Sequence, residues 1–327
     1  MVGNIVNKAH ALQETGMNKA HQLFWNSWAE SYQDFSELIE PYRDAQRDLA
    51  QATIAALGGG IQRKRFHLMD VGGGAGNMLA PLLDELAAKR GNLDGVSYTL
   101  TDSSETMLSI AQKRLDGFKK TYPQVAFRIL AGNTFDKNFA EELKLEPADI
   151  VICSWNIEYY PYEKREEMVA LLVDLANQQG IVAFSSTLRL PTGMKLRQIL
   201  MPLGRAQVFH ALLTGGPAKM GKVINSLKKI TQFGTAISSQ HFPEKPTLAE
   251  LDNLVRKTGL YSVSTGYHLY GASAMVIINE DGSKLPPLPK LPIAQALAGK
   301  DGYQDYPETV SFGGYLKMLF SRRANPK

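Results

Sequence analysis

A glycine-rich turn preceded by an acid is the feature of this chain that most clearly indicates ligand chemistry. The stretch from Leu68 to Leu79 reads L-M-D-V-G-G-G-A-G-N-M-L, between an apolar run typical of a buried strand and a helical segment. Glycines in such a turn let the backbone come close to a bound molecule. With Asp70 two residues before the first glycine, this turn predicts a site for a nucleoside-containing ligand.

The glycine spacing argues against two common nucleotide-binding motifs. Counting from Gly72 and Gly74, the third glycine of a dinucleotide-binding G-x-G-x-x-G motif would fall on Asn77. The G-K-[ST] ending of a phosphate-binding loop is also absent from the sequence. An ordinary tight turn between a strand and a helix is the plain structural alternative.

A second acid, Asp102, ends the next expected strand in the run Y-T-L-T-D-S. Nucleotide-binding folds place an acid at this position to accept hydrogen bonds from ribose hydroxyls. An aspartate followed by Ser-Ser-Glu is equally typical of a helix cap, so the residues alone leave both roles open.

Together these motifs resemble the class I S-adenosylmethionine-dependent methyltransferases, over about residues 20–280. The resemblance implies S-adenosylmethionine as cofactor, with Asp70 near its cationic methionine end and Asp102 on its ribose hydroxyls. Asn133 stands where many members have an aspartate that accepts from the adenine amino group, and an amide carbonyl can also accept. The resemblance implies further cofactor contacts at Gly72, Gly74, Gly76, Ser103, Met107 and Ser154.

The loop after the fourth expected strand reads S-W-N-I-E-Y-Y-P over residues 154–161. Substrates of open α/β sheets bind beyond the carboxyl ends of the strands, which makes Trp155, Asn156, Glu158 and Tyr159 candidates for the acceptor site. The N-P-P-Y loop of enzymes that methylate adenine or glutamine is absent. Its absence argues against nucleic-acid bases as acceptors, and no nucleic-acid partner is expected.

Methyl transfer requires alignment of donor and acceptor, and a base where the acceptor carries a proton. His210, His241 and Tyr159 are the candidate bases. Methylation of an alkene would generate a carbocation, and Glu158 or a histidine is the candidate to quench it. Each histidine is also compatible with a purely structural role. The histidine spacing does not match a metal site, and Cys153, the single cysteine, falls within an apolar strand, so no metal is expected.

Aromatic residues near the N-terminus recur at helical spacing. Trp25, Trp28, Tyr32 and Phe35 are three or four residues apart and share one helical face. Class I methyltransferases commonly lay N-terminal helices over the cofactor, and F-W-N-S-W-A-E-S-Y resembles the W-x-x-x-A-x-x-Y pattern found there. Trp28 and Tyr32 are therefore predicted to contact the substrate, with core packing as the alternative.

Alternating strand and helix segments predict an α/β fold with a doubly wound, mainly parallel sheet of seven strands. Strands are expected at 66–71, 96–101, 125–130, 150–154 and 181–185, and a closing antiparallel pair at 261–269 and 272–279. Helices are expected near 78–88, 104–118, 139–143, 165–178 and 247–257. The resulting divisions are an N-terminal helical lid (1–60), a cofactor-binding core (61–186), a basic helical insertion acting as a second lid (187–245), a closing helix and strand pair (246–280), and a proline-rich linker and tail (281–327).

The net charge of +4 is unevenly distributed. No acid occurs between Asp174 and Glu244, where eight basic residues lie, while the other 28 lysines and arginines face 32 acids. In placement, this insertion resembles the one that covers the acceptor in ubiquinone/menaquinone C-methyltransferases. Apolar helices with unopposed cations, Arg197 and Arg205 among them, fit a hydrophobic acceptor with an anionic head. A basic surface that pairs with acids elsewhere in the fold is the alternative.

Acceptors that fit are a prenyl diphosphate, a prenylated phenol or quinol, and an acidic polyketide, methylated at carbon or oxygen. A cyclase or binding protein that keeps the cofactor without transferring its methyl group is the competing class. The sequence contains neither a signal-like N-terminus nor the ~18–20 apolar residues of a membrane span, so a cytoplasmic location is expected. The short apolar and basic run at 313–323 favours peripheral membrane contact or docking on the domain.

Overall fold

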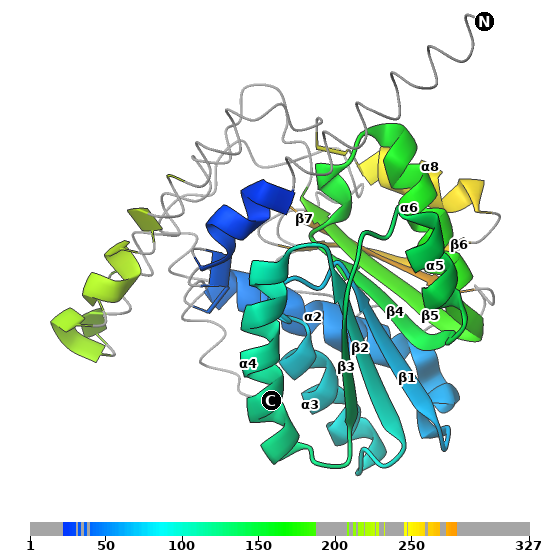
Figure 1. Ribbon diagram of the computed structural model, residues 1–327, viewed down its shortest axis with the longest axis horizontal. Helices are drawn as coiled ribbons and strands as arrows, with labels where there is room; N and C mark the ends of the chain where they lie inside the picture. The colour runs from blue at the N-terminus through cyan, green and yellow to red at the C-terminus, as the bar shows by residue number, and fades with distance from the viewer. Residues whose placement is uncertain are drawn as a thin grey trace, which may run out of the picture.

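A mixed sheet of seven strands runs through the part of the chain that the structure describes (Figure 1). The computed structural model describes residues 22–30, 32–33, 36–37 and 40–187, isolated residues and short runs between 208 and 232, and residues 245–246, 248–258, 261–268 and 273–279. The strand order is β3-β2-β1-β4-β5-β7-β6. The strands are β1 Phe66–Val71, β2 Val96–Asp102, β3 Ala126–Ala131, β4 Ala148–Ser154, β5 Ala176–Thr187, β6 Tyr261–His268 and β7 Ser273–Asn279.

Helices cover both faces of the sheet, as Figure 1 shows. One face carries α2 (Glu40–Leu57), α3 (Leu79–Arg90) and α4 (Glu105–Thr121), and the other carries α5 (Lys137–Lys144), α6 (Tyr162–Leu175) and α8 (Leu248–Lys257). Two short 3-10 helices, η1 (Gly58–Gln62) and η2 (Ile157–Tyr159), connect a helix to a strand in each case.

The strand sequences explain the two helical layers. Along β1, Phe66 and Leu68 pack among the residues of α2, α3 and α4, whereas Met69 and Val71 pack among those of α5, α6 and α8. Successive side chains of a strand point to opposite faces, so a strand covered on both faces must be apolar nearly throughout. The apolar run before the glycine turn therefore encodes a central strand.

The predicted α/β fold with a parallel core is confirmed. β1 pairs in parallel with β2 and with β4, β2 with β3, and β4 with β5. β7 pairs antiparallel with both β5 and β6, as expected for the last two strands. This order places the change in winding direction between β1 and β4, where α/β sheets open a crevice at the carboxyl ends of the strands.

The helix expected at 165–178 is displaced in the structure. α6 begins at Tyr162, directly after Pro161, whose φ of −63° suits a helix start, and it ends at Leu175. β5 then begins at Ala176, which pairs with Ala148 of β4. The side chain of Asn177 donates a hydrogen bond to Asp149, which favours the strand over continued helix.

Several predicted divisions fall largely outside the described residues. Of the insertion at 187–245, the structure describes Thr187, Lys245 and some residues between 208 and 232, and it describes none of 281–327. None of the described helices combines the length and the apolarity that crossing a membrane requires.

The carboxylate of Asp149 connects the amino-terminal ends of three strands, at the end of the sheet away from the glycine turn. Asp149, at the start of β4, accepts hydrogen bonds from the backbone N–H of His67 (2.8 Å), from Asn177 Nδ2 (2.7 Å) and from Arg63 Nη1. Arg63 also donates to Gln179 at 2.7 Å. Because the network joins β1, β4 and β5, it fixes the register of the central strands.

We predict that Asp149→Ala lowers the free energy of unfolding by about 2–4 kcal/mol, because it leaves the His67 N–H and the Arg63 guanidinium without their acceptor. Urea denaturation followed by circular dichroism measures the change. Asp94→Ala, which removes an exposed aspartate, is the matched control and should change the free energy by less than about 0.5 kcal/mol. Equal effects of the two substitutions would show that the network does not stabilise the fold.

Candidate functional site

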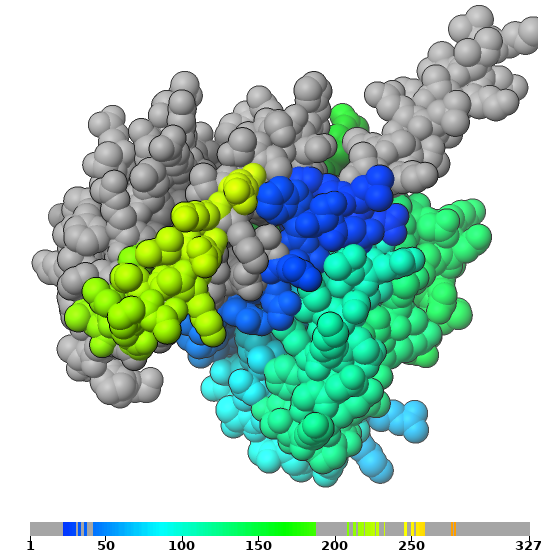
Figure 2. All heavy atoms as spheres, turned by 60° about the vertical axis from the view of Figure 1, so that its left-hand side comes forward, coloured from blue at the N-terminus to red at the C-terminus, as the bar shows by residue number. Residues whose placement is uncertain are grey.

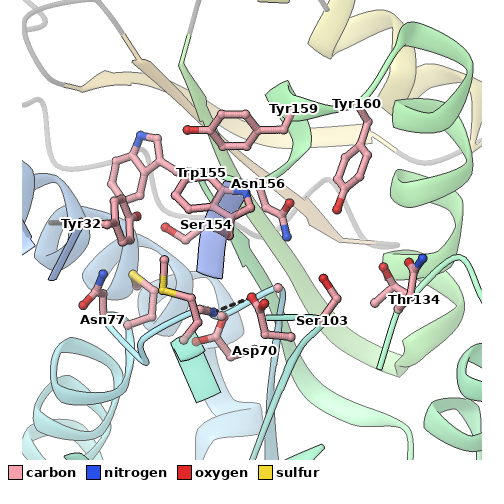
Figure 3. A pocket seen from close by; sticks show the side chains of 18 of the residues that line it. Tyr32, Asp70, Asn77, Ser103, Thr134, Ser154, Trp155, Asn156, Tyr159 and Tyr160 are labelled. Carbon is pink, nitrogen blue, oxygen red and sulfur yellow. Dashed lines mark hydrogen bonds between the residues drawn. The ribbon is translucent and has the colours of Figure 1, made fainter. Parts of the chain in front are cut away.

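A pocket opens at the carboxyl ends of β1, β2 and β4 and is closed on one side by the N-terminal segment (Figure 3). Asp70 of β1, Asp102 of β2 and Ser154 of β4 all line it, together with Tyr32 from the N-terminal segment. The pocket thus occupies the crevice that the strand order predicts.

The glycine turn makes room for the polar side chains of this pocket. Gly72 and Gly74 have φ values of +64° and +55°, which side chains rarely tolerate. A Cβ atom on Gly72 would lie 1.6 Å from Asn156 Nδ2, and one on Gly73 would lie 2.6 Å from the Asp70 carboxyl group. The missing side chains therefore allow Asn156 and Asp70 to approach the turn.

Asp70 is fully buried at the end of β1. Its Oδ2 accepts a hydrogen bond from the Tyr98 hydroxyl at 2.8 Å, while its Oδ1 has no hydrogen-bond partner among the described residues. Burial, with a smaller contribution from the charge of Asp102, raises the pKa of Asp70 to about 7 despite the opposing effect of the Tyr98 hydrogen bond. A cation placed at Oδ1 would reverse this shift.

Asp102 forms the opposite wall of the same half of the pocket. Its Oδ2 accepts from the backbone N–H of Gly74 at 2.9 Å, and its Oδ1 accepts from that of Ser104 at 2.7 Å. Burial raises the pKa of Asp102 to about 6 although these backbone bonds lower it. Each carboxylate oxygen can accept a second hydrogen bond, so both face the pocket with spare capacity.

The first described helix, residues 22–30, docks on the turn between β2 and α4. Gln22 Nε2 donates to the carbonyl oxygen of Ser103 at 2.6 Å, and Asn26 Oδ1 accepts from the Ser104 hydroxyl at 2.6 Å. Figure 2 shows this helix, in dark blue, against the cyan-green surface that includes α4. The docking brings Trp25 into the pocket wall.

Aromatic rings line the half of the pocket away from Asp70 and Ser103 (Figure 3). Tyr159 contacts Trp25 with ring centroids 5.1 Å apart, Trp25 contacts Tyr32 at 5.5 Å, Tyr32 contacts Tyr42 at 6.1 Å, and Tyr42 contacts Trp155 at 4.6 Å. We call these five residues the ring cluster. Their mostly edge-to-face geometry is the preferred arrangement of aromatic pairs.

Hydrogen bonds hold Trp155 of the ring cluster in a strained backbone conformation. Its φ of 50° makes it the single non-glycine residue with positive φ in the described part of the chain. Its backbone N–H donates to the carbonyl oxygen of Ser185 at 3.0 Å and to the Ser185 hydroxyl at 3.1 Å. Such strained residues persist where the surroundings fix them, often at functional sites.

Tyrosine hydroxyls of the ring cluster stay protonated at neutral pH. Burial, with a smaller contribution from the Glu158 charge, raises the pKa of Tyr32 to about 12 and that of Tyr159 well above its usual value. This direction disfavours a phenolate at Tyr159, whose role as a base stays a prediction.

The pocket brings together most of the residues predicted from the sequence. Those that line it are Tyr32, Asp70, Gly72, Gly74, Asp102, Ser103, Met107, Asn133, Ser154, Trp155, Asn156 and Tyr159. The Asn133 carbonyl predicted to accept from a ligand already accepts from the Phe135 N–H at 3.0 Å, which leaves one lone pair for a ligand.

Three predicted site residues lie elsewhere. Gly76 does not line the pocket: it has a φ of +73°, and a Cβ there would lie 3.4 Å from Leu100, so it allows close packing of the turn. Trp28 packs on Phe24 instead of lining the pocket. Glu158 is buried behind it, where its Oε1 accepts from Thr187 N (3.2 Å) and Oγ1 (2.7 Å), so its predicted contact with the acceptor is wrong.

Four predicted residues, Arg197, Arg205, His210 and His241, lie outside the described residues. Conversely, the pocket includes residues that the sequence did not single out as its lining, among them Trp25, Tyr42 and Gln46. The sequence does contain a sign of the role of Gln46. This polar residue stands on the apolar face of α2, between Tyr42 and Leu49, and the structure shows that it is buried.

Comparisons with known proteins agree with this geometry. A family model described as a methyltransferase domain matches residues 69–182, which span β1 to the middle of β5. No curated protein matches the chain.

Similar solved structures include an O-methyltransferase family protein from Burkholderia thailandensis, with 17% identity, a TM-score of 0.42, and coverage of 74% of this chain and 60% of that chain. Magnesium protoporphyrin IX methyltransferase from Synechocystis PCC 6803 has 15% identity and a TM-score of 0.49, covering 80% of this chain and 99% of that one. A cyclopropane synthase from Mycobacterium tuberculosis has 16% identity and a TM-score of 0.41, and the match covers 70% of this chain and 64% of that chain. The chain thus spans less than two thirds of the first and third of these proteins.

The raised pKa of Asp70 leads to a stability prediction. A carboxyl group whose pKa is raised in the folded state destabilises the fold once it ionises, so its contribution falls as pH rises from about 4 to about 7. We therefore predict that Asp70→Asn, which keeps the acceptor for Tyr98, equals the wild type in stability at pH 4 and exceeds it by roughly 2–4 kcal/mol at pH 8. Urea denaturation at both pH values measures the difference. A difference that does not change with pH would contradict the assigned burial of this charge.

Proposed function

We propose that this chain, a class I S-adenosylmethionine-dependent methyltransferase with its methyltransferase domain at residues 69–182, transfers the methyl group to a small, hydrophobic acceptor that carries an anionic group. The observation that carries the cofactor half of this proposal is the buried Oδ1 of Asp70, which has no hydrogen-bond partner in the part of the chain that the structure describes.

The donor set around Asp70 fits S-adenosylmethionine. The described pocket walls carry two carboxylates with raised pKa values, Asp70 buried and Asp102 half-buried, a cost that a cationic ligand offsets. Asp70 would bind the cationic methionine end, and Asp102 would accept from the ribose hydroxyls. Ser103, Met107 and Asn133 would border the adenine base.

The bound cofactor supplies a methyl group already activated by its sulfonium. The protein therefore has to align the acceptor, exclude water and accept a proton where one is released. Among the described residues that face the acceptor half, the titratable groups are tyrosines, which stay protonated at neutral pH. The acceptor is thus one that ionises by itself, or His210 or His241 serves as base.

The ring cluster and the basic insertion together support a hydrophobic acceptor. Leu227, a described residue of the insertion, packs against the cluster that Tyr42, Ala45 and Trp155 form. We propose that the rest of the insertion continues over this half of the pocket and brings Arg197 and Arg205 to the anionic group. A prenylated phenol or quinol, a polyketide or a prenyl diphosphate, methylated at carbon or oxygen, has these properties.

The helix at residues 22–30 would act as a lid on the cofactor. Its contacts through Gln22 and Asn26 to Ser103 and Ser104 lie beside the ribose-binding carboxylate of Asp102. Closing the pocket in this way removes water, which strengthens the electrostatic interactions inside it.

We predict that Asp102→Asn weakens S-adenosylmethionine binding by about 10- to 100-fold, the loss expected for one charge-assisted hydrogen bond. Isothermal titration calorimetry measures the affinity. Asp116→Asn, the same substitution at an exposed position of α4, is the matched control and should bind as the wild type does. Equal affinities of the two variants would remove Asp102 from the cofactor site.

Incubation with S-adenosylmethionine carrying a deuterated methyl group tests the reaction itself. Mass spectrometry of prenylated phenols, polyketides and prenyl diphosphates should show one labelled methyl group in at least one product. Formation of S-adenosylhomocysteine without a methylated product, or no turnover with any acceptor, would contradict the proposal.

For an anionic acceptor, we expect the double variant Arg197→Gln/Arg205→Gln to raise KM at least tenfold and to leave cofactor affinity unchanged, because each arginine would contribute a charge-assisted contact. Lys222→Gln removes a charge from an exposed position of the same insertion and controls for net charge. A KM that rises equally in both variants would indicate a general effect of charge and not a site at these two arginines.

A further inference from the structure

Two buried polar atoms that line the pocket have no hydrogen-bond partner among the described residues: Asp70 Oδ1 and Gln46 Nε2. The first is an acceptor on the cofactor side. The second is a donor, and neither the cofactor contacts of Asp70 and Asp102 nor the arginines of the insertion provide an acceptor for it.

Gln46 lines the pocket from the same helix as Tyr42 of the ring cluster. It follows Tyr42 by one helical turn on α2, so the two side chains share a helical face. Only 4% of Gln46 is exposed, and Ala45 and Leu49 beside it are buried apolar residues. A leucine would ordinarily fill such a position, because an amide buried without a partner destabilises the fold.

Gln46 Nε2 has no acceptor among the described residues. Asn77 lines the same pocket, but its Oδ1 already accepts from the Ser36 hydroxyl and from Arg114. A ligand atom that accepts a hydrogen bond would therefore satisfy Gln46.

We infer that Gln46 donates a hydrogen bond to an oxygen atom of a flat acceptor ring that lies against the ring cluster. This inference rests on the proposed function, since it assigns the acceptor to that half of the pocket. Aromatic walls bind a flat ring in offset or edge-to-face contact, a geometry that a saturated chain does not use. Gln46 then fixes the rotation of that ring relative to the methyl donor, and the favoured substrate class is a phenol-type or carbonyl-bearing ring.

The test uses the full chain saturated with S-adenosylhomocysteine and two probes of equal shape, 2-naphthol and 2-methylnaphthalene. Equilibrium dialysis gives the Kd of each probe, and the ratio of the two Kd values isolates the contribution of the oxygen atom. In Gln46→Leu we expect 2-naphthol to lose about five- to tenfold in affinity relative to 2-methylnaphthalene, the worth of one hydrogen bond. Affinity for 2-methylnaphthalene and for S-adenosylhomocysteine should be unchanged.

Gln51→Leu is the matched control, because Gln51 lies on the same helix, is exposed and does not line this pocket. It should leave the ratio as in the wild type. Gln46→Met is the second variant: a side chain of similar length that cannot donate should shift the ratio in the same direction even where leucine disturbs the packing.

An unchanged ratio in both Gln46 variants would overturn the inference, as would failure of the wild-type complex to bind either probe. Both outcomes leave the proposed function intact as long as S-adenosylhomocysteine binds. Failure of S-adenosylhomocysteine itself to bind the wild type would overturn the proposed function, and the inference with it.

Discussion

A carboxylate buried at the end of the central strand is the constraint around which this site is built. Burying Asp70 is unfavourable in the absence of a cation, yet the fold supports it with a hydrogen bond from Tyr98 and with a glycine beside it that leaves space for its oxygens. The second carboxylate, Asp102, adds to the cost because the two charges repel. Both costs are offset when a cationic ligand enters, since its charge favours the ionised carboxylates and Asp70 Oδ1 has no hydrogen-bond partner among the described residues.

The stabilising interactions that offset this cost lie at a distance from it. The Asp149 network joins the amino-terminal ends of β1, β4 and β5, and the carboxyl-terminal ends of β1 and β4 contribute to the pocket. Apolar side chains fill the space between, on both faces of the sheet. These interactions offset the cost of the strained Trp155 backbone and of the two carboxylates with raised pKa values at the opposite end of the strands.

The sequence predicted the central strands, the glycine turn and the cofactor half of the pocket because these signals are local. Strand period, glycine spacing and an acid at a strand end all lie within a few residues of one another. The cofactor contact predicted for Gly76 does not appear in the pocket lining. A missing side chain makes room equally well for a ligand or for Leu100, and only the fold decides between them.

The acceptor half depends on docking, which a linear pattern does not encode. Trp25 and Trp28 both fit the helical spacing of the aromatic residues. However, the helix at 22–30 contacts the loop between β2 and α4, and these contacts place Trp25 in the pocket wall. Glu158 stands next to pocket residues in sequence, yet the short helix η2 directs its carboxylate to Thr187. Gln46 escaped notice because one polar residue on an apolar helix face is a weak signal without its burial.

The acceptor half of the pocket is assembled from two parts of the chain. Trp155 and Tyr159 lie inside the segment that matches the methyltransferase family, residues 69–182, whereas Trp25, Tyr32 and Tyr42 precede it. The helix α2, which carries Tyr42, also fills part of the core with Leu49 and Ile54, so this helix serves the fold and the site at once. Two chains that agree closely over the matched segment can therefore differ in the wall that faces the acceptor, and a comparison of acceptor sites has to include the residues before that segment.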